Sequence, residues 1–436
     1  MPLLAAAYAA LIVYGSLFPF VVANTGGTSL LGFLTAPAPA RYSTPDVVTN
    51  VLAYMPLGLL LAIWWRGKGL VASVMLATVA GSALSFSMEF VQQFIPSRVA
   101  SLTDLITNTG GTLVGAVIAG FVRTDRLNSG APLQWRRRWV KPGRIFDLGL
   151  MVIGLWALSQ VAPLVPSLDV GNLRHGLAPL WQTLRNPETF NSTQWAVYVL
   201  YIAGLALLAA TLGNPGRPAV VLFFAFVAVV LLYKIPVVGR QLSLEALAGA
   251  LAAAALIVPL HALPPGWSAC ASALLILAGF VCAELASEAD SVRHSFNWVP
   301  FRGQLENTLA GIVSILELVW PAAAIAYLAR SATPPARRRA MAWSGGVALA
   351  LLVFGLEWYQ QYLPGRYGDI TAVLLMAGAW LLFWWIPAEG TIAAAQMSGA
   401  RAFHSRGIRA PVVVALLGLA AAFAYGALGL HELPAA

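Results

Sequence analysis

The stretch LVASVMLATVAGSALSFSMEFVQQFIPSR, residues 70–98, is an apolar helix that ends in a group of polar residues. Its apolar part is long enough to cross a lipid bilayer. Its end carries Glu89, Gln92 and Gln93, and residues at i, i+3 and i+4 share one face of a helix. A carboxylate within a membrane span is energetically costly, so such a residue indicates a functional site by default.

The same polar pattern occurs a second time, as EWYQQYLPGR at residues 357–366. Both copies read Glu-x-x-Gln-Gln, an aromatic residue, an aliphatic residue and Pro-x-Arg. An aspartate then opens the next apolar run. Identities at fixed spacing rarely coincide by chance, so we interpret the two copies as a duplicated site. The candidate residues of the second copy are Glu357, Gln360, Gln361, Arg366 and Asp369.

The overall composition is that of a membrane protein. Of the 436 residues, 59% are hydrophobic and 10% are charged, and the mean hydropathy is +0.77. These values exclude a soluble globular domain. The formal net charge of +9 comes from Lys and Arg between apolar runs, so it predicts no nucleic-acid partner. The sequence has no phosphate-binding loop, HExxH, CxxC or GxSxG motif, and it predicts no cofactor or metal site.

The apolar runs predict an all-α polytopic membrane protein with about thirteen transmembrane helices. The Lys and Arg residues of the loops concentrate on one side of the membrane, which predicts a cytoplasmic N-terminus and an outer C-terminus. Both Glu-x-x-Gln-Gln clusters then lie at the outer face of the membrane. The predicted spans are residues 2–23, 46–65, 70–95, 102–122, 145–165, 194–212, 218–235, 243–262, 268–286, 305–329, 341–362, 369–386 and 410–430.

These spans group into three parallel four-helix repeats with one C-terminal helix left over. In each repeat a short turn with Pro and Arg joins the third and fourth helices, and the first helix leads to a proline-bearing outer segment. The middle repeat carries Val229, Leu232 and Tyr233 where Glu, Gln and Gln are expected. The predicted domains are 1–125, 145–262 and 266–388, followed by a cytoplasmic segment and last helix at 389–436.

Further polar candidates follow the turn of the first repeat. Asp104, Asn108, Gly111 and Gly115 fall on one helix face. The Gly-x-x-x-Gly stripe would let a neighbouring helix approach closely, and Asn108 could then donate to Glu89 or Gln92. Asn50, near the start of the second helix, joins the candidate set. Asn50 and Asn108 could equally be interhelical packing contacts, and Asp104 and Asp369 could be helix N-caps.

Glu89 and Glu357 lie near helix C-terminal ends, where the helix dipole disfavours an anion. A compensating partner is needed, and Arg98 and Arg366 are the nearest candidates. Two interpretations remain open: a purely structural Glu–Arg clasp, or a binding or catalytic role.

These residues resemble the VanZ-like family, named after a membrane protein associated with teicoplanin resistance. The resemblance covers about residues 10–122, and a weaker one covers about 290–386, where Val373 replaces the expected Asn. It implies a bacterial cytoplasmic-membrane protein with an envelope-related role that includes antibiotic resistance, and it implies no particular reaction. The matching elements of the first copy are Pro19-Phe20, Asn50, Pro56-Leu57-Gly58, Ser85, Glu89, Gln92, Arg98, Asp104, Asn108 and Gly111.

Three functions fit these observations. The first is a non-enzymatic envelope factor that binds a polar lipid headgroup, a lipid-linked glycan or a lipoglycopeptide, with Gln on sugar hydroxyls and Arg on phosphate. The second is an enzyme acting on a lipid-linked substrate, with Glu89 as general base and Asp104 as a second acid. The third is a proton-coupled transporter that uses Glu89 and Glu357. Whether the protein is an enzyme is left open at this stage.

Overall fold

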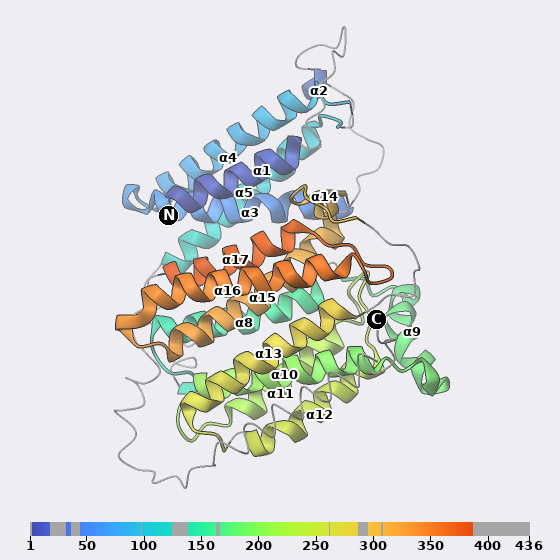
Figure 1. Cartoon of the computed structure of the whole chain (residues 1–436). Coiled ribbons are helices and arrows are strands. Elements are labelled where there is room, and N and C mark those ends of the chain that lie inside the picture. The colour runs from blue at the N-terminus through green and yellow to red at the C-terminus, as the bar shows by residue number, and fades with distance from the viewer. Residues whose placement is uncertain are drawn as a thin grey trace. The chain divides into compact units, whose positions relative to one another are not determined.

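The computed structural model describes residues 2–17, 32–35, 44–96, 98–123, 138–162, 166–260, 262–286, 295–306 and 308–386. Their regular structure is helical, with isolated bridges such as the one between Asn297 and Asp369. The chain divides into two compact units (Figure 1). The N-terminal unit comprises Met1–Trp135 and Leu305–Leu309, and the C-terminal unit comprises Arg136–Gln304 and Ala310–Ala436.

The N-terminal unit is a small helix bundle in which α3 and α5 pack backbone against backbone. A Cβ atom added to Gly111 or Gly115 on α5 would meet the main chain of α3, and one added to Gly58 on α3 would meet Thr112. The predicted glycine stripe therefore does bring a neighbouring helix close. The helices of this unit are α1 (Pro2–Leu17), α2 (Gly32–Thr35), α3 (Thr44–Trp64), η1 (Arg66–Lys68), α4 (Leu70–Gln92) and α5 (Leu102–Arg123).

The C-terminal unit is built around α10, whose residues Leu205, Leu207 and Leu208 are completely buried. Helix α13 runs beside α10 (Figure 1), and α12 packs on it as well. All or most residues of the following helices belong to this unit: α8 (Arg144–Val161), α9 (Val170–Arg185), η2 (Pro187–Thr189), α10 (Ser192–Leu212), α11 (Ala219–Tyr233), α12 (Leu244–Leu260), α13 (Pro265–Leu285), α14 (Arg302–Glu306), α15 (Thr308–Ala332), η3 (Pro335–Arg337), α16 (Arg338–Gln360) and α17 (Ile370–Trp385).

The proline-bearing segment around Pro179, which follows the first helix of the predicted middle repeat, forms helix α9. The side chain of Asp169 caps the start of α9 by accepting from the backbone N–H groups of Gly171 and Asn172. Exposed Trp181 and Leu184 share the helix with polar residues. The run is too polar to be recognised as a span, because its apolar residues recur with helical periodicity instead of continuously.

Among the described residues, seven helices are long and apolar enough to cross a membrane, and α1, α11, α12 and α17 include shorter apolar segments. These helices indicate a multi-pass membrane protein. The count of thirteen spans, the three repeats and the orientation remain predictions. The predicted helix 410–430, the segment 389–436 and Pro19-Phe20 lie outside the described residues. The seven long segments are Val47–Trp64, Leu70–Gln92, Arg144–Val161, Ser192–Leu212, Gly266–Leu285, Ala310–Ala332 and Pro335–Gln360.

Candidate functional site

Glu89 lies in the last turn of α4, with 3% of its surface exposed. Its Oε2 atom accepts a hydrogen bond of 2.8 Å from the backbone N–H of Ser101, the residue that precedes α5. The first N–H groups of a helix have no partner within that helix. Glu89 therefore supports the start of α5 from the preceding helix, and the positive end of α5 offsets the unfavourable position of the anion at the end of α4.

Gln92 and Arg98 donate hydrogen bonds to the end of α1 and not to Glu89, the partner expected for Arg98. The Nε2 atom of Gln92 donates to the carbonyl of Ser16 at 2.9 Å, and Nη2 of Arg98 donates to the carbonyl of Gly15 at 3.0 Å. The last carbonyls of a helix need external donors, which explains this arrangement. Gln93 donates to the Phe90 carbonyl of its own helix turn at 3.2 Å. The side-chain donors that we expected to bind a ligand therefore donate to helix carbonyls instead.

Asn50 and Asp104 connect α3 with α5. The Nδ2 atom of Asn50 donates to Oδ1 of Asp104 at 2.9 Å and to Oγ1 of Thr107 at 3.3 Å. Asp104 is the third residue of α5, so it lies in the first turn, where a carboxylate is favoured. The bond satisfies both side chains across the tight α3–α5 contact.

Asn108 donates to the hydroxyl of Ser85 at 3.0 Å, and our expectation of a bond to Glu89 or Gln92 is wrong. The reason is geometric. Helices α4 and α5 are joined by a short turn and run antiparallel, so a residue further into α5 meets a residue further back along α4. Glu89 lies level with Ser101, and Asn108 lies more than a turn deeper.

Two buried polar atoms near these residues form no hydrogen bond of normal geometry among the described residues: Oδ1 of Asn108 and the Tyr54 hydroxyl, which lies near the Ser85 hydroxyl. The Tyr54 hydroxyl is close enough to Glu89 and Asp104 to feel the charge of both carboxylates. Tyr54 is not part of the duplicated sequence pattern, although it follows Asn50 by four positions and so shares its helix face. We call Asn50, Tyr54, Ser85, Glu89, Asp104 and Asn108 the Glu89 cluster.

The C-terminal unit repeats the arrangement of Glu89 around Glu357, which is 4% exposed. Its Oε2 atom accepts from the backbone N–H of Asp369 at 2.7 Å. Gln360 donates to the backbone carbonyl and the carboxylate of Glu284, near the end of α13. Arg366 donates to the carbonyls of Ala283 and Ala286 at 2.9 Å each. Gln361, like Gln93, donates within its own helix turn, to the carbonyl of Trp358.

The two arrangements also share their sequence separations. Each Glu accepts from a backbone N–H 12 residues further on, each Gln donates to a carbonyl 76 residues back, and each Arg donates to a carbonyl 83 residues back. Asp369 therefore corresponds to Ser101, and our pairing of Asp369 with Asp104 is wrong. Asp369 is the N-cap of α17, where Oδ1 accepts from the N–H and hydroxyl of Thr371. The N-cap interpretation of Asp369 is thus confirmed.

The same correspondence shows what the second arrangement lacks. The polar residues of the Glu89 cluster other than Glu89 itself are matched by apolar residues, all of them buried. We call the hydrogen bonds that the Glu, the first Gln and the Arg of each copy make to helix ends the glutamate framework. This framework is present in both units, whereas the surrounding polar cluster is present only in the N-terminal unit. In the order Asn50, Tyr54, Ser85, Asp104 and Asn108, the matching residues are Leu318, Ala322, Val353, Ala372 and Met376.

A third arginine has the same structural role. Arg240 donates through Nε to the Ala162 carbonyl at 2.6 Å and through Nη2 to the Ser159 carbonyl at 2.8 Å, at the end of α8. Burial lowers the pKa of the Arg240 guanidinium, and the nearby carboxylate of Glu317, 3.9 Å away, acts in the opposite direction. Glu284 and Glu317 do not belong to the duplicated sequence pattern, so that pattern does not indicate them.

The apolar helix bundle defines a multi-pass membrane protein. Residues 4–123 match the VanZ/LLP1 family. This match includes every member of the Glu89 cluster and does not extend to Glu357. No curated protein and no solved structure matches the chain. Among the described residues, no group of three or more His, Cys, Asp and Glu side chains is placed to hold a metal ion.

Proposed function

We propose that the Glu89 cluster binds the polar headgroup of a lipid, or of a lipid-linked glycan or lipoglycopeptide. In this proposal the headgroup donates hydrogen bonds and the cluster accepts them. The observation that carries this proposal is the pair of buried polar atoms without a hydrogen bond of normal geometry, Tyr54 Oη and Asn108 Oδ1, beside the buried carboxylate of Glu89. A buried polar atom without a hydrogen bond costs about 1–3 kcal/mol. A ligand that supplies hydrogen bonds at these positions recovers that free energy.

The chemistry of the cluster favours hydroxyl or ammonium groups over phosphate. Arg98 and Gln92, the donors that would suit a phosphate or a sugar oxygen, are bonded to the end of α1. What remains around Glu89 is rich in acceptors: carboxylate oxygens, an amide oxygen and a phenol oxygen. Sugar hydroxyls and amines are the headgroup components that donate to such atoms.

We infer that the two glutamate arrangements descend from an internal repeat. The shared separations of 12, 76 and 83 residues support this inference. In the second copy the framework of Glu357 is retained while the polar cluster is replaced by a hydrophobic core. The second copy then serves as a scaffold, and the N-terminal copy is the ligand site.

The proposed setting is the cytoplasmic membrane of a bacterium, with the N-terminus inside. In that orientation the end of α4 and the start of α5 face outward, so the Glu89 cluster is reached from the outer leaflet. This supports a role in the cell envelope, which includes the antibiotic resistance implied by the family resemblance.

Acid–base catalysis on a lipid-linked substrate is the second candidate function. Its support is the closeness of two carboxylates, Glu89 and Asp104, which interact electrostatically with each other and with the Tyr54 hydroxyl. Two carboxyl groups in different environments can divide the roles of acid and base. Asp104 has a hydrogen bond from Asn50, whereas Glu89 has one from a backbone N–H.

The test is native mass spectrometry of the protein purified with its native lipids. Wild type is compared with Glu89→Gln, Asn108→Leu and the matched control Glu357→Gln, which alters the framework in the copy without a polar cluster. We expect a discrete lipid or lipid-linked glycan in wild type and Glu357→Gln, and its loss in the other two variants. Identical lipid profiles in all four correctly folded proteins would refute the proposal. Release of a headgroup by wild type during incubation would favour the enzyme.

A further inference from the structure

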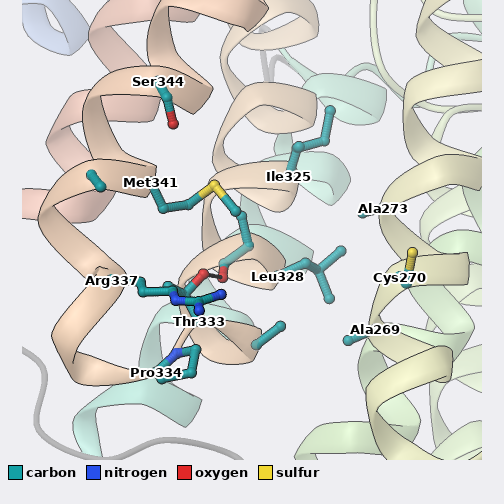
Figure 2. Close-up of a pocket in the computed structure, with 13 residues that line it drawn as sticks. Ala269, Cys270, Ala273, Ile325, Leu328, Thr333, Pro334, Arg337, Met341 and Ser344 are labelled. Atoms are coloured by element: carbon teal, nitrogen blue, oxygen red, sulfur yellow. Dashed lines mark hydrogen bonds between the residues drawn. The ribbon is translucent and has the colours of Figure 1, made fainter.

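A cavity of about 500 Å³ lies in the C-terminal unit between α13, α15 and α16 (Figure 2). Its lining extends along α15 from Thr333 at the helix end to Ile325, a distance of about 12 Å at the helical rise. We call it the α15–α16 slot. It is lined by Ala269, Cys270, Ala273, Ile325, Leu328, Ala329, Ala332, Thr333, Pro334, Arg337, Ala340, Met341 and Ser344.

The walls of the slot are small and apolar. Ala269 and Ala273 line one wall, while Leu328 and Met341 face them in the close-up (Figure 2). A volume of this size is typical of sites for small organic ligands. Water in such a slot would find few hydrogen-bonding partners. An aliphatic chain would meet apolar surface along the whole depth of the slot.

One end of the slot is basic. Arg337 lies there beside Thr333 (Figure 2), and Arg338 and Arg339 follow directly in the sequence. None of the lining residues is acidic. A guanidinium is the side-chain group that matches a phosphate with two parallel hydrogen bonds. The slot thus combines an apolar channel with a cationic end.

An exposed tryptophan lies near the same end of the slot. Trp267, near the start of α13 and two residues before Ala269, is 49% exposed. Tryptophan concentrates at the level of the lipid headgroups. An apolar slot with a tryptophan and a cation near one end has the polarity expected of a lipid site.

We propose that the α15–α16 slot binds an anionic phospholipid of the surrounding bilayer, with one acyl chain in the slot and the phosphate on Arg337. Juxtamembrane arginines attract anionic lipid headgroups, and here the slot gives the attached chain a place to bind. The site is separate from the Glu89 cluster and does not depend on the function proposed for it.

The chain contains its own reporter for this site. Cys270 lines the slot and is exposed, whereas Cys282 on the same helix is buried. A lipid in the slot should shield the Cys270 thiol from N-ethylmaleimide and leave Cys282 unreactive throughout. The rate of Cys270 modification would be measured by mass spectrometry, in nanodiscs of phosphatidylcholine with or without phosphatidylglycerol.

The key variants are Arg337→Ala and the matched control Arg339→Ala, which removes the same charge two residues away from a side chain outside the lining. We expect phosphatidylglycerol to slow Cys270 modification in wild type and Arg339→Ala. In Arg337→Ala, we expect the lipid concentration needed for protection to rise about fivefold, the effect of one basic residue at an anionic surface. Equal losses in both variants would show general surface attraction and overturn the proposal.

A filling variant tests the acyl-chain part of the proposal separately. Ala273→Phe places a ring in the slot without changing any charge, and thermal unfolding would establish that the variant is folded. We expect native mass spectrometry to show bound phosphatidylglycerol on wild type and none at this site on Ala273→Phe. Equal retention of phosphatidylglycerol by folded Ala273→Phe would overturn the proposal, as would equal protection of Cys270 by phosphatidylcholine alone.

Discussion

Substitution of Gly115 by alanine should disrupt the N-terminal unit far more than substitution of Gly110, five positions earlier on the same helix. A Cβ atom at position 115 would lie 1.8 Å from the main-chain oxygen of Met55 on α3, and real Cβ contacts are essentially never shorter than 3.0 Å. Helices α3 and α5 would therefore have to separate by roughly 1.2 Å or more. At position 110, a Cβ atom meets nothing within 4 Å.

The magnitude follows from what the added methyl group meets. Overpacking usually costs about 1–3 kcal/mol, and backbone cannot rotate away as a flexible side chain can. Separation of α3 from α5 also stretches the Asn50–Asp104 hydrogen bond, which is 2.9 Å long. We therefore expect Gly115→Ala to destabilise this unit by about 3 kcal/mol or more. Gly110→Ala should be neutral or stabilising by up to about 1 kcal/mol, because alanine favours the helix.

The assay is hydrogen exchange by mass spectrometry on detergent-purified protein, read on peptides from α3 and α5. Peptides from α10, in the core of the C-terminal unit, serve as the internal reference. We expect faster exchange in α3 and α5 for Gly115→Ala and unchanged exchange for Gly110→Ala. Equal exchange in the two variants would refute the backbone-to-backbone packing of α3 on α5.

Three further predictions concern the glutamate framework. Glu89→Ala should lower the free energy of unfolding by about 1–3 kcal/mol, because it leaves the Ser101 N–H without its acceptor. Glu89→Gln keeps an acceptor and should cost less. Equal melting temperatures of the two variants would contradict this role of Glu89. Arg366→Ala should speed hydrogen exchange at the end of α13, since it removes two hydrogen bonds to helix carbonyls, while Arg366→Lys should restore part of the protection. Asp369→Ala should cost about 0.5–2 kcal/mol as the loss of the α17 N-cap, and Asp369→Asn much less; a thermal melt in which Asn and Ala behave alike would argue against a capping role.

Most helix positions were predictable, because a long apolar run has few alternatives in a membrane. The predicted span 102–122 and α5 (Leu102–Arg123) differ by one residue. Helix α9 was not among the predicted spans, because its apolar residues recur with helical periodicity between polar ones and the mean hydropathy of the segment is low. The Glu-x-x-Gln-Gln pattern drew attention to buried residues that bond to helix ends, since carboxylates in apolar helices are rare.

The sequence by itself determined the class of the molecule, its apolar helices and the existence of two matching polar patterns. Only the tertiary structure decided what those side chains bind. Arg98 and Gln92 could have faced a ligand, but the helix end of α1 has carbonyls without donors, and these are the nearest acceptors once the helices pack. The structure also distinguished the two copies, because the members of the Glu89 cluster come from α3, α4 and α5, and no local sequence pattern specifies which helices are neighbours in space.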